Sequence, residues 1–162
     1  MKMNLLRNTF TNFKKIKLLI TFILITSCTE YTYEYEDGLR LYFKDQFKIS
    51  KFNSNYYIIS INNCNTCLGQ KLNLSYLNQH KIKYLTLIIV GKSERKEIID
   101  LLNSLSKKYI ILKDPDKNIY QYSTGLGKPL LIITKNNKLK LVKNINDTSI
   151  KKLKSYLNKI YF

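Results

Sequence analysis

The chain has 162 residues, with 28 lysine and arginine residues against 11 aspartate and glutamate residues, and a formal charge of +17. A chain of this length suits one compact domain. Lysine supplies almost all of the basic residues. No arginine-rich or aromatic nucleic-acid motif accompanies them, so nucleic acid is not expected as a partner.

The N-terminus begins with a basic segment and continues into a short apolar run. Five basic residues and no acidic residue precede the apolar residues 18–25. This order is typical of a secretory signal. The run has about eight residues, whereas a membrane-spanning helix needs about 20. A transmembrane anchor is therefore not expected.

The apolar run ends in Ile25-Thr26-Ser27-Cys28. This tetrapeptide resembles the lipobox of bacterial lipoproteins, in which small residues precede a cysteine that is acylated and becomes the mature N-terminus. The resemblance implies that residues 1–27 are a removable signal peptide and that lipid on Cys28 anchors the chain in the cell envelope, facing the periplasm or the exterior. An ordinary secretory signal that ends near Cys28 is the alternative. Because the five charges of residues 1–27 are all basic, residues 28–162 carry +12.

Residues 28–36 are expected to form the lipidated N-terminus and a short tether, and the domain is expected to span residues 37–162. Tyr31, Tyr33 and Tyr35 alternate with polar residues, and residues 39–43 alternate in the same way. Asp37-Gly38 lies between the two runs, and such a pair is a strong signal for a hairpin turn. The sequence therefore predicts an N-terminal β-hairpin.

From residue 56 the pattern becomes α/β. Strands are expected at residues 57–61, 84–90, 109–112, 129–134 and 139–143, and the uninterrupted apolar run 84–90 indicates a buried parallel strand. Helices are expected at residues 65–80, 93–107 with Ser93 as N-cap, 116–122 and 147–160. A turn is expected at Asn136-Asn137. Alternating strands and helices closed by a hairpin predict one α/β domain, a central sheet flanked by helices.

Cys64 and Cys67 are separated by two residues, where the first predicted central strand ends and the next helix begins. The free N–H groups and the dipole of a helix N-terminus stabilise an anion, which lowers the pKa of the first thiol. The second sulfur lies within one helical turn, close enough to form a disulfide or to resolve a mixed one. Exported compartments favour such disulfides.

This order of elements, with the two cysteines at the first strand-to-helix junction, resembles the thioredoxin superfamily over residues 31–162. The chain is most similar to the membrane-tethered thiol–disulfide oxidoreductases related to peroxiredoxins. The resemblance implies a central mixed sheet, with Cys64 as nucleophile, Cys67 as resolving thiol, and Pro129 as a cis-proline that packs beside the pair and contacts the substrate. It implies exported thiol or disulfide proteins and an upstream redox partner as partners, and no cofactor or metal.

Three other interpretations of the cysteine pair remain open: a permanent structural disulfide, half of a zinc site, and a degenerate domain used only for binding. A tetrahedral zinc site needs four ligands, and His80 is the single histidine of the chain, so the metal site is the least favoured. Two functions are left. The protein is either a tethered thiol–disulfide oxidoreductase or a non-catalytic thioredoxin-like binding lipoprotein with a structural disulfide.

Overall fold

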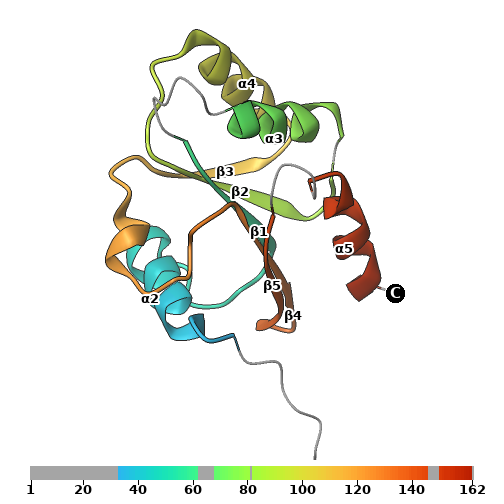
Figure 1. The fold of residues 1–162 in the computed structure, drawn as a ribbon. Coiled ribbons are helices and arrows are strands. Elements are labelled where there is room, and N and C mark those ends of the chain that lie inside the picture. The colour runs from blue at the N-terminus through green and yellow to red at the C-terminus, as the bar shows by residue number, and fades with distance from the viewer. Residues whose placement is uncertain (1–32, 62–67, 81, 146–149, 162) are drawn as a thin grey trace, which may run out of the picture. The chain divides into compact units, whose positions relative to one another are not determined.

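The computed structural model describes residues 33–61, 68–80, 82–145 and 150–161. The chain divides into two units, Met1–Glu30 and Tyr31–Phe162, and every described residue belongs to the second. This unit contains a five-stranded sheet in the order β3-β2-β1-β4-β5 (Figure 1). The strands are β1 (Asn55–Ser60), β2 (Leu85–Val90), β3 (Ile110–Asp114), β4 (Leu130–Lys135) and β5 (Lys138–Asn144). β1, β2 and β3 are parallel, whereas β4 is antiparallel to both β1 and β5.

Helices cover both faces of this sheet (Figure 1). One face packs against α3 (Leu68–Gln79), α4 (Lys96–Ser106) and α5 (Leu153–Tyr161), and a 3₁₀ helix, η2 (Ile150–Lys152), leads into α5. The opposite face packs against α2 (Glu36–Phe47) and the 3₁₀ helix η1 (Asn118–Gln121). The described unit is therefore an α/β fold with a central mixed sheet flanked by helices, as the sequence predicted.

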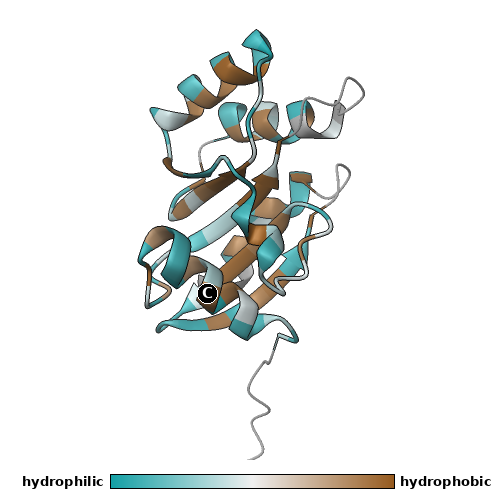
Figure 2. Ribbon diagram, turned by 90° about the vertical axis from the view of Figure 1, so that its left-hand side faces the viewer, coloured by the Kyte–Doolittle hydropathy of each residue, from teal (hydrophilic) through white to brown (hydrophobic). Residues whose placement is uncertain are grey.

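The central strands are buried on both faces. In β1, Tyr57 and Ile59 belong to the core under α3, whereas Tyr56 and Ile58 belong to the core under α2. All six residues of β2 are buried, and Figure 2 shows the central strands as mostly hydrophobic. A parallel strand covered on both faces needs apolar side chains at consecutive positions. The prediction of a buried parallel strand from the run 84–90 is confirmed.

The predicted N-terminal hairpin is wrong, because residues 36–47 form the helix α2. Leu39, Tyr42 and Phe43 are completely buried, and their spacing of three and four residues places them on one face of the helix. The Arg40 Nε donates a 2.8 Å hydrogen bond to the Glu36 carboxylate one turn earlier, a pairing that supports a helix. The apolar residues of this segment fit both the two-residue period of a strand and the helical period. Burial of Leu39, Tyr42 and Phe43 against the sheet favours the helix.

Gly38 lies inside α2 rather than in a turn. A Cβ at this position would lie 1.7 Å from the carbonyl oxygen of Ser123. Only glycine therefore lets the loop that contains Ser123 lie against the helix. The same loop is bound by the Tyr33 hydroxyl, which donates a 3.1 Å hydrogen bond to the carbonyl oxygen of Thr124. Asp37-Gly38 thus reflects close packing of two backbones and not a chain reversal.

The other predicted elements are present with shifted ends. α4 begins at Lys96 with no side-chain N-cap, so the N-cap role predicted for Ser93 is wrong, and the Ser93 hydroxyl instead accepts a 3.3 Å hydrogen bond from the Arg95 N–H. The Asn136-Asn137 turn is confirmed. Its residues have φ values of 54° and 61°, as a two-residue hairpin loop requires. Residues 65–67 of the first predicted helix and residues 147–149 of the last lie outside the described residues.

Candidate functional site

The carboxyl ends of the three parallel strands are tied together by backbone hydrogen bonds. The Ile61 N–H donates to the carbonyl oxygen of Val90 at 2.7 Å, and the Gly91 N–H donates to that of Asp114 at 2.8 Å. Gly91 has a φ of 94°, and a Cβ there would lie 2.4 Å from the Ile61 carbonyl oxygen. Glycine is therefore required where the ends of β1 and β2 approach each other. In open α/β sheets, ligands bind at the carboxyl ends of the strands. We call this end of the sheet its carboxyl edge.

The predicted cysteine pair falls next to this edge in the sequence. β1 ends at Ser60 and α3 begins at Leu68, so Cys64 and Cys67 belong to the segment that joins the central strand to the following helix. Both cysteines lie outside the described residues, as does Cys28. Their roles as nucleophile, resolving thiol and lipid attachment point stay predictions.

Pro129 lies at the same edge as the end of β1. It precedes Leu130, the first residue of β4, which pairs with Ile58 of β1. No peptide bond among the described residues is cis, so the bond between Lys128 and Pro129 is trans and the predicted cis bond is wrong. The trans form is favoured before proline by about 0.5–1 kcal/mol. β4 makes its pairings to both neighbours with the trans form in place. The predicted contact of Pro129 with a substrate stays a prediction.

A tyrosine that the sequence analysis did not single out reaches the end of β1. The Tyr120 hydroxyl, on η1, donates a 3.1 Å hydrogen bond to the Ser60 hydroxyl. Ser60 is half-buried and Tyr120 is 55% exposed, so a phenol ring lies at the surface beside the last residue of β1. The chain contains 13 tyrosines, and no spacing in the sequence distinguishes this one.

The loops at this edge carry more basic than acidic side chains. Lys92 pairs with Asp116 at 3.4 Å, and both side chains are exposed. The loops that follow β2 and β3 and precede β4 contain four basic residues, Lys92, Arg95, Lys117 and Lys128, and two acidic residues, Glu94 and Asp116. A positive surrounding of this kind favours the thiolate form of a nearby cysteine.

Asp114 is a buried carboxylate that the sequence analysis did not single out. It is completely buried, and it accepts hydrogen bonds from the N–H groups of Asn118 and Ile119 at 2.9 Å and from the Tyr42 hydroxyl at 3.1 Å. The two amides belong to the first turn of η1, where backbone N–H groups have no partner within the helix and need an acceptor from outside it. One donor belongs to α2 and the other two belong to η1. Asp114 therefore fixes η1 and α2 against β3.

His80, the candidate zinc ligand, lies just beyond α3. Its ring stacks on that of Tyr76 with centroids 4.4 Å apart. α3 has 12 residues from Leu68 to Gln79, a length of about 18 Å at 1.5 Å per residue, so His80 is far from Leu68, the neighbour of Cys67. Among the described residues, no group of three or more histidine, cysteine, aspartate or glutamate side chains is arranged to hold a metal ion.

No protein-family model matches this chain, and no curated protein is significantly similar to it in sequence. Within the described part of the chain, no helix is both long and apolar enough to cross a membrane. The described unit is an α/β fold, and its mixed five-stranded sheet with helices on both faces is compatible with a thioredoxin-like fold.

Proposed function

We propose that this protein is a membrane-tethered thiol–disulfide oxidoreductase that exchanges disulfides with exported proteins through Cys64 and Cys67. The observation that carries the proposal is the position of the pair in the chain, between the last residue of β1 and the first residue of α3. A cysteine at the start of a helix is next to free backbone N–H groups and the positive end of the helix dipole. These lower the pKa of its thiol and supply the thiolate that attacks a disulfide.

The order of the strands supports the same proposal. β1, α3 and β2 form a parallel strand–helix–strand unit, and β4 and β5 form an antiparallel hairpin on the other side of β1. This is the order on which the resemblance to the thioredoxin superfamily rests. The trans bond before Pro129 and the helix α2 in place of a hairpin depart from it. The proposal therefore rests on the cysteines and the strand order, not on the proline.

The proposed exchange has two steps. The Cys64 thiolate attacks one sulfur of a partner's disulfide, which forms a mixed disulfide and releases the other partner sulfur as a thiolate. Cys67 then loses its proton and attacks the sulfur of Cys64, which releases the second partner thiolate and leaves a Cys64–Cys67 disulfide. The partner gains two electrons and the pair loses two. An upstream dithiol protein returns the pair to its reduced form, and the reverse sequence oxidises a partner.

The proposed location is a bacterial membrane of the cell envelope. Residues 1–27 are removed, Cys28 is acylated, and the tether enters α2, which begins at Glu36. A single acyl chain holds a protein only marginally at a membrane, so stable anchoring takes two or more chains. A tethered domain of this kind meets exported proteins, in which disulfides form and persist.

Trapping in the cell tests the exchange. We expect Cys67→Ser to accumulate mixed disulfides with other proteins on non-reducing gels, because the first attack proceeds and the second fails. Cys64→Ser should trap nothing and is the matched control. Absence of trapped species in both variants would contradict the proposal.

A non-catalytic binding lipoprotein is the second candidate, and the trans Lys128–Pro129 bond is the observation that favours it. A redox titration separates the two functions. A catalytic pair should be reduced at mild potentials, whereas a structural disulfide typically has a potential below about −300 mV.

A further inference from the structure

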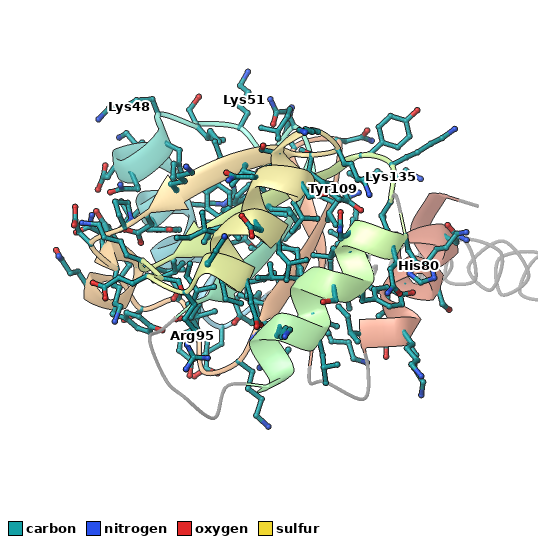
Figure 3. The ribbon with its side chains drawn as sticks, turned by 90° about the horizontal axis from the view of Figure 1, so that it is seen from above. Lys48, Lys51, His80, Arg95, Tyr109 and Lys135 are labelled. Atoms are coloured by element: carbon teal, nitrogen blue, oxygen red, sulfur yellow. The ribbon has the colours of Figure 1, made fainter. Side chains whose placement is uncertain are left out.

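A groove runs along the end of the sheet where the parallel strands β1, β2 and β3 begin, opposite their carboxyl ends. It consists of two adjoining hollows of about 710 and about 700 Å³, which share Asn53, Ser54 and Tyr84 as lining residues. The first hollow extends past the starts of the parallel strands to Tyr109, and the second reaches the β4–β5 turn at Asn136. In Figure 3, Tyr109 and Lys135 lie on the same side as Lys48 and Lys51, and Arg95 lies on the opposite side. We call this feature the amino-edge groove.

The lining of the amino-edge groove is basic. It includes Lys83, Lys108 and Lys135, and none of the lining residues that the structure describes is an aspartate or a glutamate. The Lys108 ammonium group donates a 3.0 Å hydrogen bond to the side-chain oxygen of Asn78. Lys83 and Lys135 are exposed, and their ammonium groups make no hydrogen bond or ion pair with another described residue. Two lysines are thus available to a negatively charged ligand.

The same groove exposes apolar surface. Tyr84 is 75% exposed and Ile110 is 69% exposed, and both line the first hollow. Tyr84 has a φ of 57°, a left-handed conformation that is a genuine outlier for so bulky a residue. The Asn55 N–H donates a 3.3 Å hydrogen bond to its carbonyl oxygen, which ties this strained residue to the start of β1. Such strain concentrates at binding sites.

We propose that the amino-edge groove binds an extended, acidic segment of a partner protein. Neighbouring strands are about 4.8 Å apart, so the groove from β3 to β4 spans about 14 Å, the length of about four extended residues. Lys83 precedes β2 and Lys135 ends β4, two strands away. Their attachment points are about 10 Å apart. The long lysine side chains can therefore reach carboxylates two or four residues apart, about 7 or about 13 Å, on one face of an extended chain. Tyr84 and Ile110 offer contacts to apolar side chains of the segment.

The shape of the site favours a segment over a flat lipid surface, since a flat surface does not enter a hollow. The described lining residues lie where the parallel strands begin, whereas the segment that contains the cysteines follows the end of β1. The inference therefore does not depend on the proposed disulfide exchange, and loss of Cys64 should leave this binding unchanged.

Fluorescence anisotropy with the purified full chain in non-ionic detergent tests the proposal. The probe is a labelled peptide of about eight residues in which aspartate and leucine alternate, long enough to span the groove. The control peptide carries lysine in place of aspartate. We expect only the acidic peptide to bind, with an affinity that falls as salt shortens the Debye length below about 10 Å. The Lys83→Glu/Lys135→Glu variant should bind about tenfold more weakly or worse, whereas Lys96→Glu, an exposed lysine at the start of α4, should bind as the unchanged chain does.

A second variant tests the apolar contact. Tyr84→Asn removes the exposed ring and leaves a residue that tolerates the left-handed conformation, so the fold should persist while the peptide binds severalfold more weakly. Three results would overturn the inference: no binding of the acidic peptide, equal binding of the basic peptide, or unchanged binding by the double variant. Binding of phosphatidylglycerol vesicles that depends on Lys83 and Lys135, without peptide binding, would identify a lipid surface instead and would also overturn it.

Discussion

The Tyr42 hydroxyl donates a 3.1 Å hydrogen bond to the carboxylate of Asp114, which joins α2 to the end of β3 inside the protein. Both residues are completely buried. The rings of Phe43, Phe47 and Tyr122 lie edge-on to that of Tyr42, with centroids 5.4 to 5.8 Å away. Aromatic side chains therefore enclose this buried polar contact. Buried polar groups need hydrogen-bond partners, and the Tyr42 hydroxyl and the Asp114 carboxylate provide them for each other.

Asp114→Asn should destabilise the protein by about 2–4 kcal/mol, because an amide offers one acceptor oxygen and no charge to three donors. Tyr42→Phe should cost about 1–2 kcal/mol, since Asp114 then keeps its two backbone donors. Asp116→Asn, an exposed neighbour, is the matched control and should change the free energy of unfolding by less than about 0.5 kcal/mol. Urea unfolding measures all three. Equal losses for Asp114→Asn and Asp116→Asn would contradict the argument.

Alkaline pH should destabilise the protein through Tyr42. Burial, and then the negative charge of Asp114, raise the pKa of Tyr42 far above its ordinary value of 10.0. Above pH 10 the unfolded chain loses this proton while the folded chain keeps it, so stability falls as pH rises, by at most about 1.4 kcal/mol per pH unit for this group. Urea unfolding at several alkaline pH values should show a shallower fall for Tyr42→Phe. Some fall should remain, because burial also raises the pKa of Tyr56 and Tyr109. An identical slope in the variant would exclude Tyr42 as a source.

Gly38→Ala should destabilise the protein by about 3 kcal/mol or more, because the new Cβ would overlap the Ser123 carbonyl oxygen at 1.7 Å and force α2 away from the loop. In an ordinary helix the same change is stabilising by about 0.5–1 kcal/mol. Gly127→Ala is the control. A Cβ at Gly127 meets nothing within 4 Å, so we expect no loss and a gain of up to about 1 kcal/mol. Thermal unfolding that ranks the variants the other way would show that α2 does not depend on this contact.

The central strands were predictable because burial on both faces leaves a signal in consecutive residues, as in the run 84–90. α2 was not, because Leu39, Tyr42 and Phe43 fit a helical face while their neighbours also alternate. Only the sheet beneath them decides between the two periods. The same limit applies at the candidate site. The position of Cys64 and Cys67 between a strand and a helix follows from the local pattern, whereas the Tyr120–Ser60 and Tyr42–Asp114 contacts join residues 60 and 72 positions apart.

Cys28→Ala should abolish labelling of the protein with radioactive palmitate, because the proposed acylation site is lost. It should also leave residues 1–27 attached, because the signal is proposed to be removed only in front of an acylated cysteine. Cys64→Ser serves as the control and should be labelled and processed normally. Gel mobility, palmitate labelling and membrane fractionation of the full chain measure the outcome. Unchanged processing and membrane retention in Cys28→Ala would sink the lipoprotein proposal.

The two thiols of the proposed pair should differ in acidity and in reactivity. Cys64 comes first at the start of the helix, where its sulfur would face solvent and the free N–H groups, whereas Cys67 comes one turn later and would be more buried. The pKa of Cys64 should therefore lie below the roughly 8.5 of a free cysteine. Burial should keep Cys67 protonated until the mixed disulfide forms.

Alkylation of the reduced protein as a function of pH measures this difference. In Cys67→Ser, the rate of modification at Cys64 should reach half its maximum below about pH 8.5. In Cys64→Ser, Cys67 should react more slowly and only at higher pH. Both variants are prepared with Cys28→Ala, so that one thiol remains in each chain. We expect the basic residues on the loops at this edge to favour the Cys64 thiolate, so added salt should raise its apparent pKa. Equal and slow alkylation of both cysteines would mean that neither thiol is activated, and the pair would then serve as a structural disulfide in a binding lipoprotein.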